Sequence, residues 1–154
     1  DVDDVFRFGS HPDVNKYTGD NMSSIEDARR VITDTWFTDY KKHGYGRLAV
    51  EVKGNQHADG RNIVIGFCGL KFLPEFERPD IGYRFLPEYW GQGIATESAR
   101  ASLKYARESL ELKNIMGIAM VENLASQNVL KKLDFKVVEQ TTLDGHDVYI
   151  YDER

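Results

Sequence analysis

The sequence predicts a single α+β domain of three layers, in which a central mixed sheet of about six strands has helices on both faces. Three observations carry this prediction. Helical periodicity dominates roughly the first forty residues, a period of two follows, and a strand, a helix and another strand then succeed one another closely. A length of 154 residues suits one hydrophobic core. We therefore expect one domain over residues 1–154.

The first part of the chain is predicted to be helical. A short helix is expected between Val2 and Tyr17, with an interruption near Gly9–Pro12. In "SSIEDARRVITDTWFTDYKK", Ser23 and Glu26 have the spacing of a capping box, and apolar residues follow at three- and four-residue steps. This pattern favours an amphipathic helix of about five turns.

From Gly46 onward the pattern is typical of strands. "RLAVEVK" alternates as a half-buried strand, "GNQHADG" supplies a turn, and "NIVIGFCGL" suits a strand buried on both faces. "DIGYRFL" completes an antiparallel meander. A helix from Ile94 to about Leu110 and a buried strand in "NIMGIAMV" then form a crossover unit with a parallel pair. "ENLASQNVLKKL" predicts a short helix, and the chain closes as a hairpin around Asp144 and Gly145.

Charge, cysteine content and hydropathy narrow the class of function. The net charge is -5 and basic residues are spread along the chain, so no nucleic-acid partner is expected, whereas an amine-bearing substrate suits the mild acidity. Cys68 is the only cysteine and the four histidines lack metal-ligand spacing, so no metal site is expected. The longest apolar run, "IVIGFCGL", is too short to span a bilayer, and the acidic start does not resemble a signal peptide. We expect a cytoplasmic protein without membrane association.

The stretch "LPEYWGQGIATESARASLKYA" places Gly91 and Gly93 immediately before a predicted helix. The unpaired amides and the dipole at a helix start attract anions, and glycine lets a phosphate approach the backbone. However, Thr96 stands where the dinucleotide signature needs a third Gly or Ala, and the Gly-Lys-Ser/Thr of a P-loop is absent. The spacing alone is equally consistent with a phosphate site and with a tight turn.

Two motifs about forty residues apart add a family resemblance: "DIGYRFLPEYWGQGIATESA" and "VENLASQNVLKKLDF". Together they resemble the GNAT superfamily of N-acetyltransferases, and specifically its RimJ/RimL-like branch. The resemblance implies a GNAT-like mixed central sheet whose fourth and fifth strands, here "DIGYRFL" and "NIMGIAMV", run parallel and splay apart. It also implies an acetyl-CoA-dependent N-acetyltransferase that transfers acetyl to a primary amine by direct attack in a ternary complex, without a metal.

The resemblance assigns the acetyl-CoA site residue by residue. The backbone amides of the glycine loop would hold the pyrophosphate of coenzyme A, and Tyr83 and Phe85 would present backbone groups to its pantetheine arm. Asn123 would bind the same arm, a role compatible with capping the helix that follows. The loop residues expected at the cofactor are Gly91, Gln92, Gly93, Ile94, Ala95 and Thr96.

The catalytic residues are not defined by the resemblance alone. Leu130 occupies the position where many family members carry a tyrosine as general acid, so Ser126 is the replacement candidate. Its other interpretation is a hydroxyl in the first helical turn that bonds to Asn123. A thiolate with a pKa of about 8.5 needs little acid help near neutral pH. Asp80 and Glu51 are the candidates for general base, although surface carboxylates of this kind are more often solvated than catalytic.

The chain departs from the family pattern in two places. The family's first strand has no counterpart in the sequence, which begins with helix-like residues. Asp134 replaces the glycine that usually precedes Phe135. That glycine ends a helix in the left-handed conformation, which Asp tolerates less well, so we expect local strain or a different cap.

Alternatives to the enzyme are a non-catalytic acyl-CoA-binding module on the same fold, suggested by Leu130, and an interaction domain whose glycines only make a turn. Within the enzyme interpretation, the acceptor is a protein N-terminus or a small-molecule amine. Its cleft is expected between the helix-rich start and the final hairpin. The apolar alternation in "DVYIYDE" would allow the edge of a homodimer.

Overall fold

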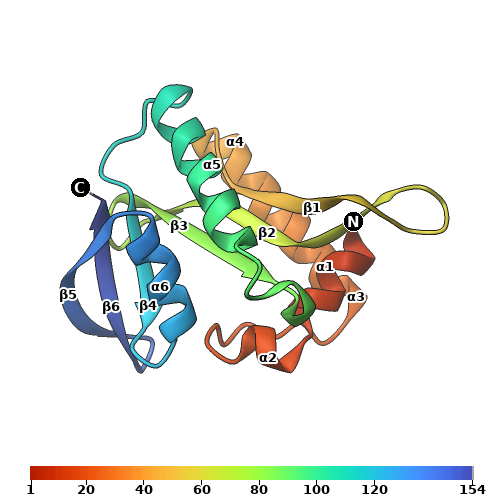
Figure 1. The fold of residues 1–154 in the computed structure, drawn as a ribbon, viewed down its shortest axis with the longest axis horizontal. Helices are drawn as coiled ribbons and strands as arrows, with labels where there is room; N and C mark the ends of the chain where they lie inside the picture. Colours follow the sequence, from red (N-terminus) through yellow and green to blue (C-terminus); the bar gives the residue numbers. More distant parts are fainter. Residues whose placement is uncertain (154) are drawn as a thin grey trace.

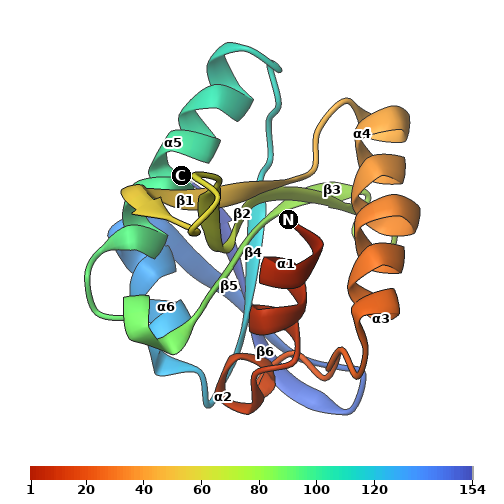
Figure 2. The same cartoon turned by 90° about the vertical axis from the view of Figure 1, so that its right-hand side faces the viewer.

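A six-stranded mixed sheet with the order β1-β2-β3-β4-β6-β5 separates two helical layers in the computed structural model, which describes residues 1–153 (Figure 1). The strands are β1 (Arg47–Gln56), β2 (Asn62–Leu73), β3 (Arg78–Phe85), β4 (Met116–Met120), β5 (Phe135–Leu143) and β6 (His146–Glu153). The helices are α1 (Val2–Gly9), α2 (Pro12–Asn15), α3 (Ile25–Arg30), α4 (Phe37–His43), α5 (Ile94–Glu108) and α6 (Leu124–Lys132). Figure 2 shows α5 and α6 on one face and α1, α3 and α4 on the other. The predicted fold class is confirmed.

Strand β2 is buried on both faces, as its apolar sequence predicts, because its side chains enter two separate cores. Ile65 and Cys68 belong to the core beneath α5 and α6. Val64 and Phe67 belong to the core beneath α1 and α3, where Phe67 meets the edge of the Phe8 ring. Fully burying side chains of this size contributes about 1.5–3 kcal/mol each. Helices on both faces are therefore what this strand requires.

Strands β3 and β4 run parallel but pair at one position only, Asp80 with Met116. Beyond that position β3 stays paired with β2 through Phe85, and β4 stays paired with β6 through Met120. Because each strand follows its outer neighbour, the two separate toward their carboxyl ends. The result is a wedge in the middle of the sheet.

The long N-terminal helix forms, but it begins and continues differently from the prediction. Its capping box consists of Ser24 and Asp27, not Ser23 and Glu26: the Ser24 hydroxyl accepts the Asp27 N–H at 3.1 Å and the Asp27 carboxylate accepts the Ser24 N–H at 3.1 Å. A π-helical segment, Val31–Trp36, joins α3 to α4. Its residues Val31, Ile32 and Trp36 pack against the core beneath α1 and α3. No helix among residues 1–153 has the length and apolarity to cross a bilayer.

The predicted dimer edge at "DVYIYDE" is wrong. These residues form β6, which lies between β4 and β5, and its Val148, Ile150 and Tyr151 are buried. The edge strands are β1 and β5 instead. The alternation in β6 serves the core of the sheet and presents no free edge.

Asp134 ends α6 in the conformation that a glycine would adopt. Its φ is 66°, which is the left-handed region. The chain therefore keeps the usual backbone path into β5 and accepts strain of about 1–2 kcal/mol for it. The alternative expectation of a different cap is wrong.

Candidate active site

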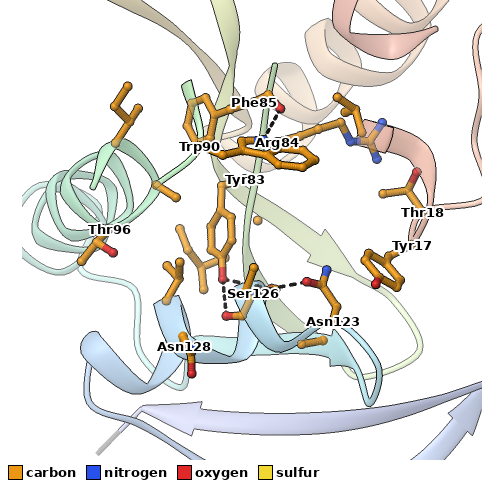
Figure 3. A pocket seen from close by; sticks show the side chains of 18 of the residues that line it. Tyr17, Thr18, Tyr83, Arg84, Phe85, Trp90, Thr96, Asn123, Ser126 and Asn128 are labelled. Carbon is orange, nitrogen blue, oxygen red and sulfur yellow. Dashed lines mark hydrogen bonds between the residues drawn. The ribbon is translucent and has the colours of Figure 1, made fainter. Parts of the chain in front are cut away.

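A pocket of about 540 Å³ occupies the wedge between β3 and β4. This volume is in the range of small-molecule sites. Its walls come from β3, β4, the starts of α5 and α6, and the segment Asp13–Thr18 around α2 (Figure 3). The predicted site residues Tyr83, Phe85, Gly91, Gly93, Ile94, Ala95, Thr96, Asn123, Ser126 and Asp80 all line it. Segments far apart in sequence thus meet around one cavity.

The glycine loop both makes a tight turn and opens amides to the pocket. Gly91 and Gly93 have φ of 70° and 80°, and a Cβ added to either would meet no protein atom within 4 Å. Packing therefore does not require glycine here, whereas the left-handed backbone favours it. The first bond of α5 runs from the Glu97 N–H to the Gly93 carbonyl at 2.9 Å. The amides of the three residues before Glu97 precede any intrahelical acceptor and carry the positive end of the dipole.

The side chains of Trp90 and Gln92 tie this loop to neighbouring backbone carbonyls. The Trp90 indole Nε1–H donates to the Phe85 carbonyl at 2.7 Å, which ties the loop to the end of β3. The Gln92 side chain donates to the Glu88 carbonyl at 2.9 Å. Gln92 does not line the pocket, unlike the other predicted loop residues. Its side chain ties the loop back to Glu88, and its predicted contact with the cofactor stays a prediction.

Asn123, Ser126 and Tyr83 form a hydrogen-bonded group across the pocket from the glycine loop. Asn123 caps α6, since its Oδ1 accepts the Ser126 backbone N–H at 3.1 Å. The Ser126 hydroxyl lies 3.1 Å from the Tyr83 hydroxyl, so the expected bond from that hydroxyl to Asn123 is wrong. Tyr83 also donates to the Ser126 carbonyl at 2.9 Å. Leu130 occupies the position where many family members carry a tyrosine as general acid. Its side chain is buried in the core beneath α5 and α6.

Asp80 is a buried carboxylate in the wall of the pocket. Its Oδ2 lies 3.4 Å from Arg47 Nη2, and both side chains are 12% exposed. Its Oδ1 is buried and accepts no hydrogen bond from any residue in the described range 1–153. Burial raises the pKa of Asp80 to about 6, and the Arg47 charge limits the rise. A carboxylate of this pKa is mostly ionised at neutral pH and can still take up a proton.

Glu51, the other predicted base, lies outside the pocket. Its carboxylate is exposed and accepts the Asn62 side-chain N–H at 2.7 Å, beside the β1–β2 turn. The final hairpin also contributes no wall to this pocket among residues 1–153, so that part of the predicted cleft is wrong. The helix-rich start does contribute, through the residues around α2.

The sequence interpretation missed the two arginines in the pocket wall, Arg47 and Arg84. Arg47 reaches from β1 across β2 to Asp80, over a Gly82 whose missing Cβ makes room: a Cβ there would lie 2.5 Å from the guanidinium. Arg84 binds the Asp20 carboxylate at 3.0 Å. Both guanidiniums lie near the Phe67 ring, at 5.5 and 5.4 Å from its centroid. The period of two in β3 could have indicated that Arg84 shares a face with Asp80.

Comparison with known proteins settles the family. The model of the acetyltransferase (GNAT) domain matches residues 1–136, which is most of the chain. This chain belongs to the GNAT acetyltransferase family. It is 31% identical over 137 residues to the uncharacterized N-acetyltransferase YoaA of Bacillus subtilis, an alignment that covers 88% of this chain and 74% of YoaA.

A second curated relative is the FsC-acetyl coenzyme A-N(2)-transacetylase of Aspergillus fumigatus, 43% identical over 54 residues, which are 35% of this chain and 23% of that protein. Among solved structures, the GNAT-family acetyltransferase from Bacillus anthracis superposes with a TM-score of 0.78 at 26% identity, over 99% of this chain and 87% of that one. The GNAT protein described here is therefore an acetyltransferase enzyme.

The GNAT family uses acetyl-CoA as its donor. The open amides at the start of α5 suit a pyrophosphate, and the wedge between β3 and β4 leaves strand-edge groups for an extended arm.

Proposed function

We propose that this enzyme is an acetyl-CoA-dependent N-acetyltransferase of the RimJ/RimL-like branch, which transfers acetyl to a primary amine by direct attack in a ternary complex. The observation that carries the proposal is a single pocket with open helix-start amides at one end and the buried Asp80 carboxylate in its wall. The name of the Aspergillus fumigatus relative, a transacetylase that uses acetyl coenzyme A, supports the donor.

The donor is held by backbone groups more than by side chains. The amides of Gly91 and of Gly93–Thr96 would hold the pyrophosphate, with Lys132 in the same pocket wall to balance its charge. The backbones of Tyr83 and Phe85 would contact the pantetheine arm, as would Asn123. The bound donor supplies an activated acetyl thioester.

Asp80 is proposed as the general base. Its carboxylate lines the pocket and can take up a proton from the incoming ammonium group, which leaves the neutral amine needed for attack. Arg47 holds the carboxylate in place and keeps it ionised near neutral pH. Glu51 has no part in this proposal because it lies outside the pocket. That Ser126 is a general acid stays a prediction.

The acceptor is a protein N-terminus or a small-molecule amine. It would enter past α2, where Asp13, Tyr17 and Thr18 line the pocket opposite the donor wall. The wall of the pocket contains both acidic and basic side chains, which suits an acceptor with one amine better than a polyamine. The cytoplasmic location and a homodimer also stay predictions.

An amine screen tests the proposed function. The enzyme is mixed with acetyl-CoA and a panel of peptide N-termini, amino acids, polyamines and aminoglycoside-like amines, and thiol release and acetylated product are both measured. We expect thiol release that depends on an amine and is matched one for one by acetylated product. Binding of coenzyme A without turnover for any amine would favour the alternative, a non-catalytic acyl-CoA-binding module.

A further inference from the structure

Arg47 and Arg84 are guanidinium groups in the same pocket wall, but their carboxylate partners differ in exposure. The side chains of Arg47 and its partner Asp80 are both 12% exposed. The Arg84 side chain is also 12% exposed, whereas Asp20, its partner at 3.0 Å, is 66% exposed. A carboxylate that remains mostly in water stabilises an ion pair little, because water screens its charge. The buried cation of the second pair is thus held by an anion that another anion can readily replace.

Contacts other than the one with Asp20 keep the Arg84 guanidinium in the pocket wall. Its central carbon lies 5.4 Å from the centroid of the Phe67 ring, close enough for a cation–π contact. Its Nη1 lies 3.4 Å from Asn15 Oδ1. The Asn15 side chain is itself fixed, because its Nδ2 donates to the Gly9 carbonyl. The guanidinium is therefore held in position independently of its carboxylate partner.

Arg84 lies on the acceptor side of the pocket, in the same wall as the proposed base. Residues 80 and 84 share one face of β3, because every second side chain of a strand points the same way. Figure 3 shows Arg84 extending toward the segment that carries Tyr17 and Thr18. The central carbons of both guanidiniums lie within 5.5 Å of the Phe67 centroid, so the two groups are neighbours on this wall. One molecule in the pocket can therefore reach both Arg84 and Asp80.

We propose that Arg84 binds a carboxylate of the acceptor, so that the substrates are small primary amines that also carry a carboxylate. A guanidinium presents its N–H donors in a planar fork, which matches the two oxygens of a carboxylate. Its Nη2 already donates to both oxygens of Asp20, at 3.0 and 3.2 Å, and the acceptor carboxylate would take that place. The amine of the same molecule would then face Asp80. This inference rests on the proposed function and names the acceptor class within it.

The depth of this carboxylate subsite favours a small acceptor over a protein N-terminus. Because only 12% of the Arg84 side chain is exposed, the acceptor carboxylate has to enter the pocket to reach it. The cavity of about 540 Å³ must hold this carboxylate together with the end of the donor's pantetheine arm. A free amino acid, with its amine at the α or at a more distant carbon, has a suitable size.

Steady-state kinetics with matched acceptors tests the inference on the wild-type enzyme. Alanine, γ-aminobutyrate and ε-aminocaproate are each compared with the corresponding primary amide, which has the same chain and lacks the negative charge. Acetylated product is measured at saturating acetyl-CoA. At the preferred chain length, kcat/KM should be about 10- to 100-fold higher for the acid than for its amide, as expected for a charge-assisted hydrogen bond. Equal values at every chain length would contradict the inference.

Substitutions at the two partners, Arg84 and Asp20, should act in opposite directions. R84Q removes the subsite and should raise the KM for the preferred amino acid about 10- to 100-fold, while the KM for its amide stays within about twofold. D20N removes the competing charge and should lower the KM for the amino acid about two- to fivefold, the range of an exposed ion pair. R84K keeps the charge without the fork and should give an intermediate KM. A raised KM in both R84Q and D20N would mean that the pair only holds the chain together, and would overturn the inference.

The outcomes separate this inference from the proposed function. Absence of turnover with every amine would overturn the proposed function and this inference with it. Turnover of amines without a preference for the acids, with R84Q like the wild type, would refute the carboxylate subsite alone. A higher kcat/KM for peptide N-termini than for all free amino acids would also overturn it. If R84Q does not fold, as judged by circular dichroism, D20N and the comparison of acids with amides on the wild type still test the subsite.

Discussion

The two sides of the pocket are built in different ways. The proposed donor side consists of the glycine loop, the start of α5 and the first turn of α6, where the amides of the first helical residues have no intrahelical acceptor. The acceptor side consists of side chains from β1, β3 and the α2 region, held by pairs such as Arg47 with Asp80. Backbone recognition depends on local conformation, whereas side-chain recognition depends on distant segments meeting. Under the proposed function, backbone recognition of the donor can therefore tolerate many sequences. Side-chain recognition of the acceptor would determine which amine reacts.

Replacing Asp80 by Asn should have the largest effect, on the acceptor side. The amide cannot take up the proton of the amine, so kcat/KM should fall on the order of 10³-fold, while the Kd for coenzyme A stays as in the wild type. Steady-state kinetics and calorimetry measure the two quantities. The matched control is E51Q, because the Glu51 carboxylate lies outside the pocket and accepts a hydrogen bond from Asn62. Equal losses in D80N and E51Q would contradict the assignment of the base.

The pH dependence provides a second readout of Asp80. The base must be ionised, and its pKa is about 6, so kcat/KM should rise about tenfold per pH unit below 6 and level off above it. The D80N variant should lose this rise of kcat/KM with pH, which is the acid limb of the pH profile. If kcat/KM of D80N still rises with pH below 6, an ionisable group other than Asp80 causes the rise.

Replacing Gly93 by Val should break the donor side alone. Its φ of 80° makes the side chain costly by about 1–2 kcal/mol, and the branched side chain crowds the amides at the start of α5. We expect the Kd for coenzyme A to rise on the order of 100-fold. The matched control is G60V, which has a φ of 84°, similar open space, and a place in the β1–β2 turn. Loss of binding in both variants would mean that strain, not the ligand site, is responsible.

Replacing Arg47 by Gln tests whether the Arg47 charge sets the pKa of Asp80, the proposed base. Without the guanidinium, the largest influence that opposes burial is lost, and the pKa of Asp80 should rise above 6. The acid limb of kcat/KM then moves to higher pH by the same amount. R84Q is the comparison variant, since Arg84 pairs with Asp20 and should leave the position of the limb unchanged.

Replacing Trp90 by Phe should have the smallest effect. The change keeps an aromatic ring but removes the indole Nε1–H, which donates to the Phe85 carbonyl at 2.7 Å. The loop loses one tie to β3, and the KM for acetyl-CoA should rise about fivefold, in line with one hydrogen bond. A KM for acetyl-CoA in W90F equal to that of the wild type would show that the loop keeps its conformation without this hydrogen bond.

The same contrast explains what the sequence could predict. The residues of the donor side lie in two contiguous motifs, so the family resemblance of those motifs could assign Gly91, Gly93, Asn123 and Ser126, although their spacing alone left a tight turn equally possible. Strand and helix positions followed from periodicity. The contact between Arg47 and Asp80 joins residues 33 apart and depends on the register of three strands, which no local pattern encodes.

Two errors in the fold have a similar origin. The alternation in "DVYIYDE" correctly indicated a strand, but the strand order that makes β6 an inner strand depends on the crossover after β4 and not on its own residues. Capping signals overlap in "SSIED", where both serines are followed three residues later by an acidic residue, Glu26 for Ser23 and Asp27 for Ser24. In the observed register, Ala28 is buried in the core beneath α1 and α3. Polar patterns at helix starts are thus ambiguous by one residue.

A crystal structure of the enzyme with coenzyme A tests the central claim most directly. We predict that the pyrophosphate contacts the amides of Gly91 and of Gly93–Thr96, and that the pantetheine arm lies between β3 and β4 with its thiol end toward Asp80. Density for coenzyme A at any other place on the surface, with the wedge free of ligand, would contradict the account.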